Sequence, residues 1–172
     1  MERVMREMKE DNKKYQMEMA MRMNPVEKML QTNDAIFVWP IDDVEQKKTR
    51  GGSIMSEYFC GRMQPYKMRL SLFPNSSRVA YNLAIYLRIY SSSNDADLEW
   101  PFVCDVSIKI VNKASPDAHR IITKHQTISK PQNNLYSWDS NNNCFYFSYL
   151  DLSSAGLLQG NNFIMQCFIN HK

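Results

Sequence analysis

Cysteine and histidine are the residues of this sequence that could act as nucleophiles, general bases or zinc ligands. The 172-residue chain holds four cysteines and three histidines, namely Cys60, Cys104, Cys144, Cys167, His119, His125 and His171. No two cysteines form a C-x-x-C pair, and no local pattern places a histidine beside a cysteine. A zinc site needs closely spaced ligands, and a catalytic thiolate needs an adjacent base. We therefore expect neither a metal site nor a catalytic cysteine.

Motifs that depend on glycine give no sign of catalysis either. The sequence contains no G-x-S-x-G nucleophile elbow and no Walker-type phosphate loop. It has only five glycines, two of them adjacent at 51–52, which leaves little material for a loop that cradles phosphate. We expect a protein that is not an enzyme and that binds no cofactor.

Charge and hydropathy exclude two further classes of partner. The net charge is only +3, and no element concentrates lysine and arginine into the basic stripe of a nucleic-acid-binding protein. No apolar run approaches the ~20 residues that span a bilayer. The first residues, MERVMREMKEDNKKYQ, are too charged for a signal peptide, so we expect a reducing, cytoplasmic location.

The N-terminal segment predicts a helix. Residues 1–30 hold eight of the twelve methionines and no glycine. Spacings of three and four residues connect a seam of Met5, Met8, Asn12, Tyr15, Met19, Arg22, Val26 and Met29. This pattern favours a coiled coil, although an amphipathic helix packed on its own domain is the alternative. Asn24 followed by Pro25 predicts a kink or break. We expect a helical stalk over 1–33 and a second domain over 34–172.

From about residue 35 the pattern changes to short alternating runs separated by polar turns. Such runs are typical of an antiparallel β-sandwich or barrel. Eight strands are predicted at Ile36–Ile41, Met55–Cys60, Lys67–Phe73, Tyr81–Tyr90, Val103–Val111, His119–Lys124, Cys144–Tyr149 and Phe163–Ile169. Residues 129–143 read as a long polar connection, residues 151–158 as a helical turn, and the charges at 42–48 as an exposed loop.

An acidic loop and an aromatic step, NDADLEWPF, separate two of these strands. We expect Trp100 and Phe102 to plug the end of the sandwich, because aromatic side chains bury much area. The carboxylates of Asp95, Asp97 and Glu99 are expected to stay in water.

The same stretch resembles the D-A-x-L-x-W-P-F segment in the C-terminal domain of the tumour-necrosis-factor-receptor-associated factors (TRAF), within the wider MATH family. AIFVWPIDDV, YKMRLSLFPN, LAIYLRIY, CFYFSYLDL and NNFIMQCFI are similar to other strands of that domain. The resemblance runs from about residue 35 to 170. It implies an all-β, eight-stranded antiparallel sandwich on a coiled-coil stalk, usually trimeric.

The resemblance also implies a function. The family works as cytoplasmic signalling adaptors, in which receptor tails or adaptor proteins lie as extended peptides along a sheet edge. The alternative is a MATH-type substrate-recognition module of a ubiquitin ligase. The RING and zinc-finger domains of the full-length family members are not in this sequence, and ligase activity would need them.

Family members hold acidic receptor peptides with an arginine and a tyrosine, whose places we align with Ser91 and Asn94. Asp95 matches an acidic position of the family, and Asn141, Asn142 and Asn143 stand where a serine cluster precedes a strand containing Phe147. These seven residues are the predicted peptide site, although the Ser91–Ser93 and Asn141–Asn143 stretches also fit plain polar turns. Acidic receptor motifs should bind weakly here, whereas polar or basic peptides could use Asp95.

One strand carries an additional outward stripe of Tyr86, Arg88 and Tyr90. The sequence leaves two interpretations open for it. The stripe is either a docking surface or the second buried half of the sandwich.

Overall fold

A computed structural model describes residues 35–172, except for 63, 76–81, 112–118, 134, 142–143 and 159–161. The predicted stalk, the break at Pro25 and the seam of Met5, Met8, Asn12, Tyr15, Met19, Val26 and Met29 lie outside the described residues, so they stay predictions. In the part of the chain that is described, no helix is long and apolar enough to cross a membrane.

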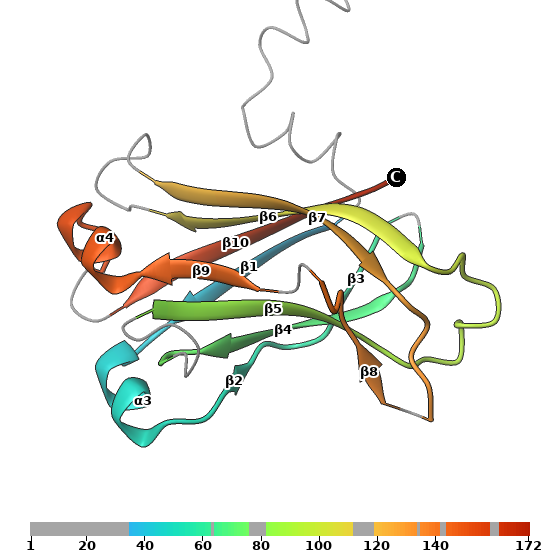
Figure 1. The fold of residues 1–172 in the computed structure, drawn as a ribbon, viewed down its shortest axis with the longest axis horizontal. Helices are drawn as coiled ribbons and strands as arrows, with labels where there is room; N and C mark the ends of the chain where they lie inside the picture. Colours follow the sequence, from blue (N-terminus) through green and yellow to red (C-terminus); the bar gives the residue numbers. More distant parts are fainter. Residues whose placement is uncertain are drawn as a thin grey trace, which may run out of the picture. The chain divides into compact units, whose positions relative to one another are not determined.

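Two antiparallel sheets make up the described domain, which confirms the predicted sandwich (Figure 1). The first sheet has the order β1-β10-β6-β7. Its strands are β1 (Ala35–Ile41), β6 (Phe102–Val111), β7 (Arg120–Ile128) and β10 (Phe163–His171). Both termini of the described chain therefore lie in this sheet, on adjacent strands.

The second sheet has the order β2-β4-β5-β8, with β3 also paired to β4 and β9 also paired to β5. Its strands are β2 (Ile54–Met55), β3 (Phe59–Cys60), β4 (Lys67–Phe73), β5 (Asn82–Tyr90), β8 (Tyr136–Ser137) and β9 (Phe145–Ser148). Two long central strands are thus bordered on both sides by short ones.

Alternating side chains build the core between the sheets. Met68, Leu70 and Leu72 of β4 are buried, as are Val106 and Ile108 of β6. Their neighbours along each strand are mostly half-buried on the opposite face. Burial of each such side chain contributes roughly 1.5–3 kcal/mol, so the period-2 pattern fixes which face of each strand turns inward.

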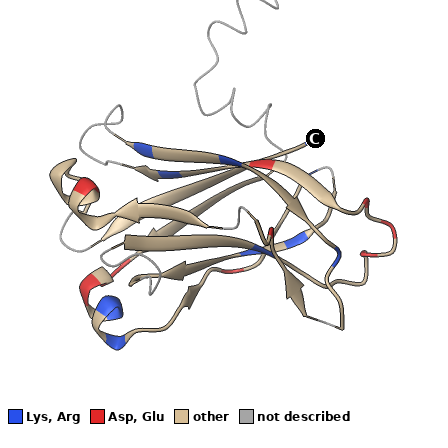
Figure 2. Cartoon of the chain, in the orientation of Figure 1, with Lys and Arg blue, Asp and Glu red and all other residues tan. Residues whose placement is uncertain are grey.

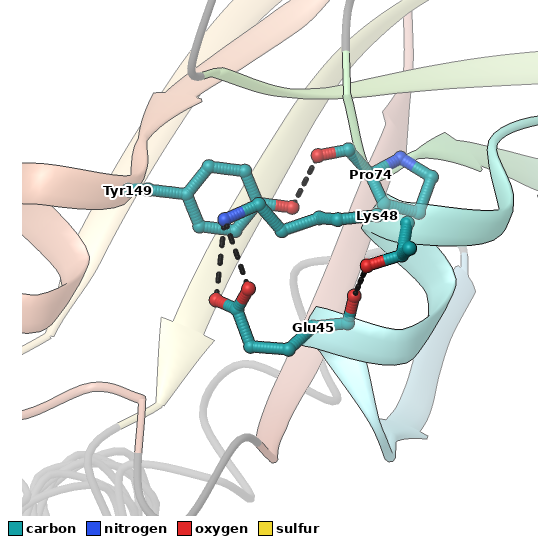
Figure 3. Close-up of polar contacts among 5 residues, drawn as sticks. Glu45, Lys48, Pro74 and Tyr149 are labelled. Carbon is teal, nitrogen blue, oxygen red and sulfur yellow. Dashed lines mark hydrogen bonds and ion pairs between the residues drawn. The ribbon is translucent and has the colours of Figure 1, made fainter.

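Two short helices, α3 (Val44–Arg50) and α4 (Tyr149–Ser154), are linked by a side-chain contact between Lys48 and Tyr149. The Lys48 ammonium lies 3.1 Å from a Glu45 carboxylate oxygen and 4.1 Å from the centroid of the Tyr149 ring (Figure 3). The Tyr149 hydroxyl donates to the carbonyl oxygen of Pro74. Burial, assisted by the Glu45 carboxylate, raises the pKa of Tyr149, so the hydroxyl keeps its proton for this bond.

Several predicted element boundaries were wrong. The charges at 42–48 lie partly in helix α3 instead of a loop, and the predicted helical turn begins earlier, at Tyr149. The predicted strand Met55–Cys60 is split into β2 and β3, because the pairing with β4 shifts by one residue between Met55–Ser71 and Phe59–Met68. At this break the Ser56 hydroxyl accepts the backbone N–H of Leu70 at 2.9 Å. A backbone N–H satisfied by a side chain needs no strand partner.

The aromatic step after the acidic loop packs as predicted. Phe102 is fully buried, and Trp100 packs against the core. The Trp100 ring meets Tyr66 edge-on at 5.2 Å between ring centroids, and its indole Nε1–H donates to the carbonyl of Asp95 at 2.9 Å. The indole therefore ties the acidic loop to the end of the sandwich.

Candidate functional site

The side of β5 that faces β8 and β9 is an interrupted sheet edge. β8 pairs with Ile89 and Tyr90, whereas β9 pairs with Asn82 through Ile85. Residues 138–144 connect the two short strands, and no described strand pairs with β5 over 86–88 on this side. Among the described strands β9 pairs with β5 alone, so its other edge is open for a further strand.

A pocket of about 120 Å³ lies between β7 of the first sheet and β9 of the second. Phe147 forms part of its wall and is buried, whereas Ile121 is 48% exposed. Charges of both signs, from Arg120 and Asp151, complete its rim. The pocket offers apolar contact beside an open strand edge, which is the combination that an added peptide strand uses.

The predicted peptide-site residues do not form one cluster. Phe147 pairs with Leu83 near one end of β5, and Ser91 follows Tyr90 at the other end. Eight residues of extended chain separate the two places, which corresponds to roughly 27 Å. An extended peptide of about eight residues would be needed to touch both ends.

Asp95 faces inward, which corrects the expectation that its carboxylate stays in water. The residue is only 8% exposed, and its two carboxylate oxygens accept the backbone N–H of Ser92 at 3.0 Å and the Ser92 hydroxyl at 2.9 Å. Asp97 and Glu99 are exposed, as expected. The loop is anchored further because the Ser91 N–H donates to the Leu135 carbonyl at 3.1 Å.

We expect Asp95→Ala to lower the free energy of unfolding by about 1–3 kcal/mol, because it leaves the two Ser92 donors without their acceptor. Urea denaturation followed by far-UV circular dichroism measures this. Asp97→Ala, in the same loop but exposed, is the matched control and should change the midpoint little. Equal midpoints for the two variants would contradict a structural role for the Asp95 carboxylate.

The asparagine end of the predicted site is held by a residue that the sequence did not single out. Asp139 is buried, and its carboxylate accepts the backbone N–H groups of Thr127 at 2.8 Å and of Asn141 at 2.9 Å. Asn94 and Asn141 are exposed, whereas Asn142 and Asn143 lie outside the described residues. The D-S-N order at 139–141 was an available signal, because aspartate commonly caps a turn two residues on.

The stripe of Tyr86, Arg88 and Tyr90 lies on the face of the second sheet that points away from the core, and all three residues are half-buried. It is therefore not a second buried half of the sandwich. Burial, followed by a hydrogen bond with the Cys144 side chain, raises the pKa of Tyr86.

The thiols show no features of a reactive site. Cys104, Cys144 and Cys167 are buried and form no disulfide bond, and only Cys60 is exposed. Burial raises the pKa of Cys167, which keeps it in the unreactive thiol form. No group of three or more potential metal ligands occurs within the described ranges.

Comparison with known proteins places this geometry in a family. The chain is 26% identical to TNF receptor-associated factor 2 of Homo sapiens over 115 residues, which covers 60% of this chain and 23% of that protein. The chain thus matches less than a quarter of that relative's length. A solved structure of Notothenia coriiceps TRAF5 has the same fold, with a TM-score of 0.59 at 15% identity over 97% of this chain and 90% of that one. The MATH domain family model matches residues 36–169. The chain belongs to the MATH domain family, with a TRAF-type C-terminal sandwich.

Proposed function

We propose that this chain is a peptide-recognition module in which an extended segment of a partner protein adds to the sheet edge at β9. The observation that carries the proposal is the open edge of β9 beside the pocket between β7 and β9. Backbone hydrogen bonds to β9 supply affinity in this mode, and side chains that enter the pocket supply selectivity.

The end of this sheet edge that lies away from Phe147 would determine which peptide charges are preferred. There the peptide meets Ser91, Asn94 and the asparagines that begin at Asn141, none of which carries a positive charge. Asp95 shapes this loop from within instead of pairing with the ligand. Polar or basic peptides should therefore be preferred at this end over acidic ones.

The resemblance to TRAF proteins supports the wider assignment. A receptor or adaptor tail is the proposed ligand, and a cytoplasmic signalling adaptor is the proposed role, with residues 1–33 as a trimerising stalk. A single edge site of this kind should be weak, roughly 10–1000 micromolar, and should gain strength from several copies on one stalk. A substrate-recognition module of a ubiquitin ligase would use the same edge, with a different partner.

The test combines a backbone change in the peptide with a side-chain change in the protein. A panel of labelled receptor-tail peptides is titrated by fluorescence anisotropy, and the best binder is resynthesised with alternate backbone N-methyl groups. N-methylation removes the donors of an added strand and should weaken binding at least about tenfold.

We expect Ile121→Asp to weaken binding of the same peptide by about tenfold, because it replaces an apolar side chain of the pocket lining with a charged one. Val38→Asp is the matched control, since Val38 is 52% exposed on β1, at the other edge of the first sheet. If N-methylation and Ile121→Asp both leave affinity unchanged, the peptide does not bind as a strand at β9.

A further inference from the structure

The outer face of the second sheet carries a cluster of aromatic and cationic side chains that the proposed edge site does not use. We name it the cation–aromatic face and define it as Tyr58, Lys67, Arg69, Arg88, Tyr90, Tyr136 and Trp138. The strand register places Lys67 opposite Tyr90 and Tyr90 opposite Tyr136. The same register places Arg69 directly opposite Arg88.

Four rings form a continuous ladder across this face. Tyr58 meets Tyr90 edge-on at 5.2 Å, Tyr90 meets Tyr136 at 5.2 Å, and Tyr136 meets Trp138 at 5.4 Å between ring centroids. The rings at the two ends of the ladder are exposed to solvent, with Tyr58 47% exposed and Trp138 42% exposed. Large aromatic side chains that remain this exposed are typical of interaction surfaces.

Three cations lie over the rings of the ladder. The Lys67 ammonium is 4.3 Å and the Arg69 guanidinium carbon 4.8 Å from the centroid of Tyr58. The guanidinium carbon of Arg88 is 4.4 Å from the centroid of Tyr136. Contact with a ring holds each cation in place while its N–H groups remain available to an anion.

This face has positive charge that the described residues do not neutralise. Like charges directly opposite each other on neighbouring strands destabilise a sheet, and Arg69 and Arg88 have this arrangement. Arg69 donates its Nε–H to the Ser56 carbonyl, so this bond does not use its terminal N–H groups. Within the described part of the chain, none of the ion pairs involves Lys67, Arg69 or Arg88. Figure 2 shows basic segments on the adjacent strands β4 and β5.

We propose that the cation–aromatic face is a second docking surface, which binds an acidic segment of a partner protein. Carboxylates of the segment pair with Arg69 and Arg88, and an apolar side chain of the segment lies against Trp138. Guanidinium groups bind carboxylates through paired N–H donors, so two neighbouring arginines favour closely spaced acidic side chains. Nucleic-acid bases fit less well, because stacking needs open ring faces and cations already lie over Tyr58 and Tyr136.

This surface borders the end of the proposed edge site at Ser91 and Asn141, but it differs from that site in the groups that bind and in the charge that they prefer. The edge site uses the backbone of β9 and favours polar or basic peptides, whereas the cation–aromatic face uses side chains on or next to β3, β4, β5 and β8 and favours acidic ones. The two proposals can therefore fail separately. Ile121→Asp tests the first, and charge reversal at Arg88 tests the second.

The experiment uses the full chain and two labelled peptides. The probe is a short peptide of glutamate and serine with a central leucine, and its partner has glutamine in place of every glutamate. At low salt the acidic peptide should bind at least about tenfold more tightly than the glutamine peptide, and added salt should reduce the difference. The indole N–H resonance of Trp138, assigned through Trp138→Phe, should shift with the acidic peptide.

Arg88→Glu should lower the affinity for the acidic peptide at least about tenfold. Lys109→Glu makes the same change of net charge on the outer face of the first sheet and should alter affinity less than about twofold. Arg88→Gln, which removes the charge without adding an opposite one, provides a second variant if Arg88→Glu fails to fold. Matching far-UV circular dichroism and urea midpoints show that the folds are intact.

Four results would overturn the proposal. The first is equal affinity of the wild type and the Arg88 variants for the acidic peptide. The second is an equal loss with Lys109→Glu, which would indicate a net-charge effect alone. The third is tighter binding of oligouridylate than of the acidic peptide. The fourth is a salt-sensitive self-association that Arg88→Glu abolishes, which would make the acidic loop of a second copy the occupant.

Discussion

Replacing Trp100 with alanine is expected to lower the free energy of unfolding by about 3–5 kcal/mol. The indole packs against the core, meets Tyr66 edge-on and donates to the Asp95 carbonyl at 2.9 Å. The substitution removes all three interactions together and leaves a cavity beneath the acidic loop. Urea denaturation, monitored by far-UV circular dichroism, measures the change.

Trp100→Phe separates the two parts of this effect. Phenylalanine keeps an aromatic ring against Tyr66 but cannot donate to the Asp95 carbonyl. Trp100→Phe should therefore lower the free energy of unfolding by less than half as much as Trp100→Ala. Trp138→Ala is the matched control, because this tryptophan is exposed and lies outside the core. If Trp100→Ala and Trp138→Ala shift the midpoint equally, Trp100 is not a structural plug.

Deleting residues 1–33 is expected to convert an oligomer into a monomer and to weaken binding to a clustered receptor tail by about 10²–10⁴-fold. The seam of 3–4 spacing predicts that this segment is the oligomerisation element, and avidity of this size is lost when several sites are no longer linked. Light scattering measures the mass, and binding to surfaces with dense or sparse peptide measures the avidity.

Point variants in the predicted stalk give a finer test. Met19→Glu places a charge on the seam and should act like the deletion, whereas Met17→Glu makes the same change off the seam and should not. Affinity for a single peptide in solution should be the same for all of these proteins. A full-length chain that is monomeric at tens of micromolar (about the range in which modest coiled coils associate) would rule out the stalk.

The sequence predicted most of the long strands well because their pattern is unambiguous, although β7, predicted over His119–Lys124, extends to Ile128. In β5 and β10, apolar residues recur at every second position, and this period is only compatible with a strand that has one buried face. The similarity of several segments to one family then ordered these strands into a sandwich. Both predictions depend on features that extend over seven residues or more.

Short elements were missed because their cause is tertiary. β8 has only two residues and lies in a stretch that reads as a polar connection. Helix α3 buries a single residue, Val44, so it shows no amphipathic period. The break between β2 and β3 is a one-residue shift in their pairing with β4, and no local pattern predicts a shift against a strand more than ten residues away.

Predictions for the site had mixed outcomes for the same reason. Phe147 lies in the wall of a pocket, but it is far along the edge from Ser91. Asp95 was expected in water because carboxylates are usually exposed, and two hydrogen bonds from Ser92 overcome this preference. The ladder from Tyr58 to Trp138 could not be predicted, since its end residues lie next to β3 and β8, which are too short to show which side chains face outward.

The short border strands of the second sheet also affect the tendency of the domain to aggregate. Long, flat sheet edges let copies of a protein join edge to edge into fibrils. Here β8 and β9 offer two and four residues, and β2 and β3 offer two each. Each stretch is too short to template a second copy of the sheet, although it can still seat a few residues of a foreign segment. The domain can therefore present an accessible edge at high local concentration without polymerising through it.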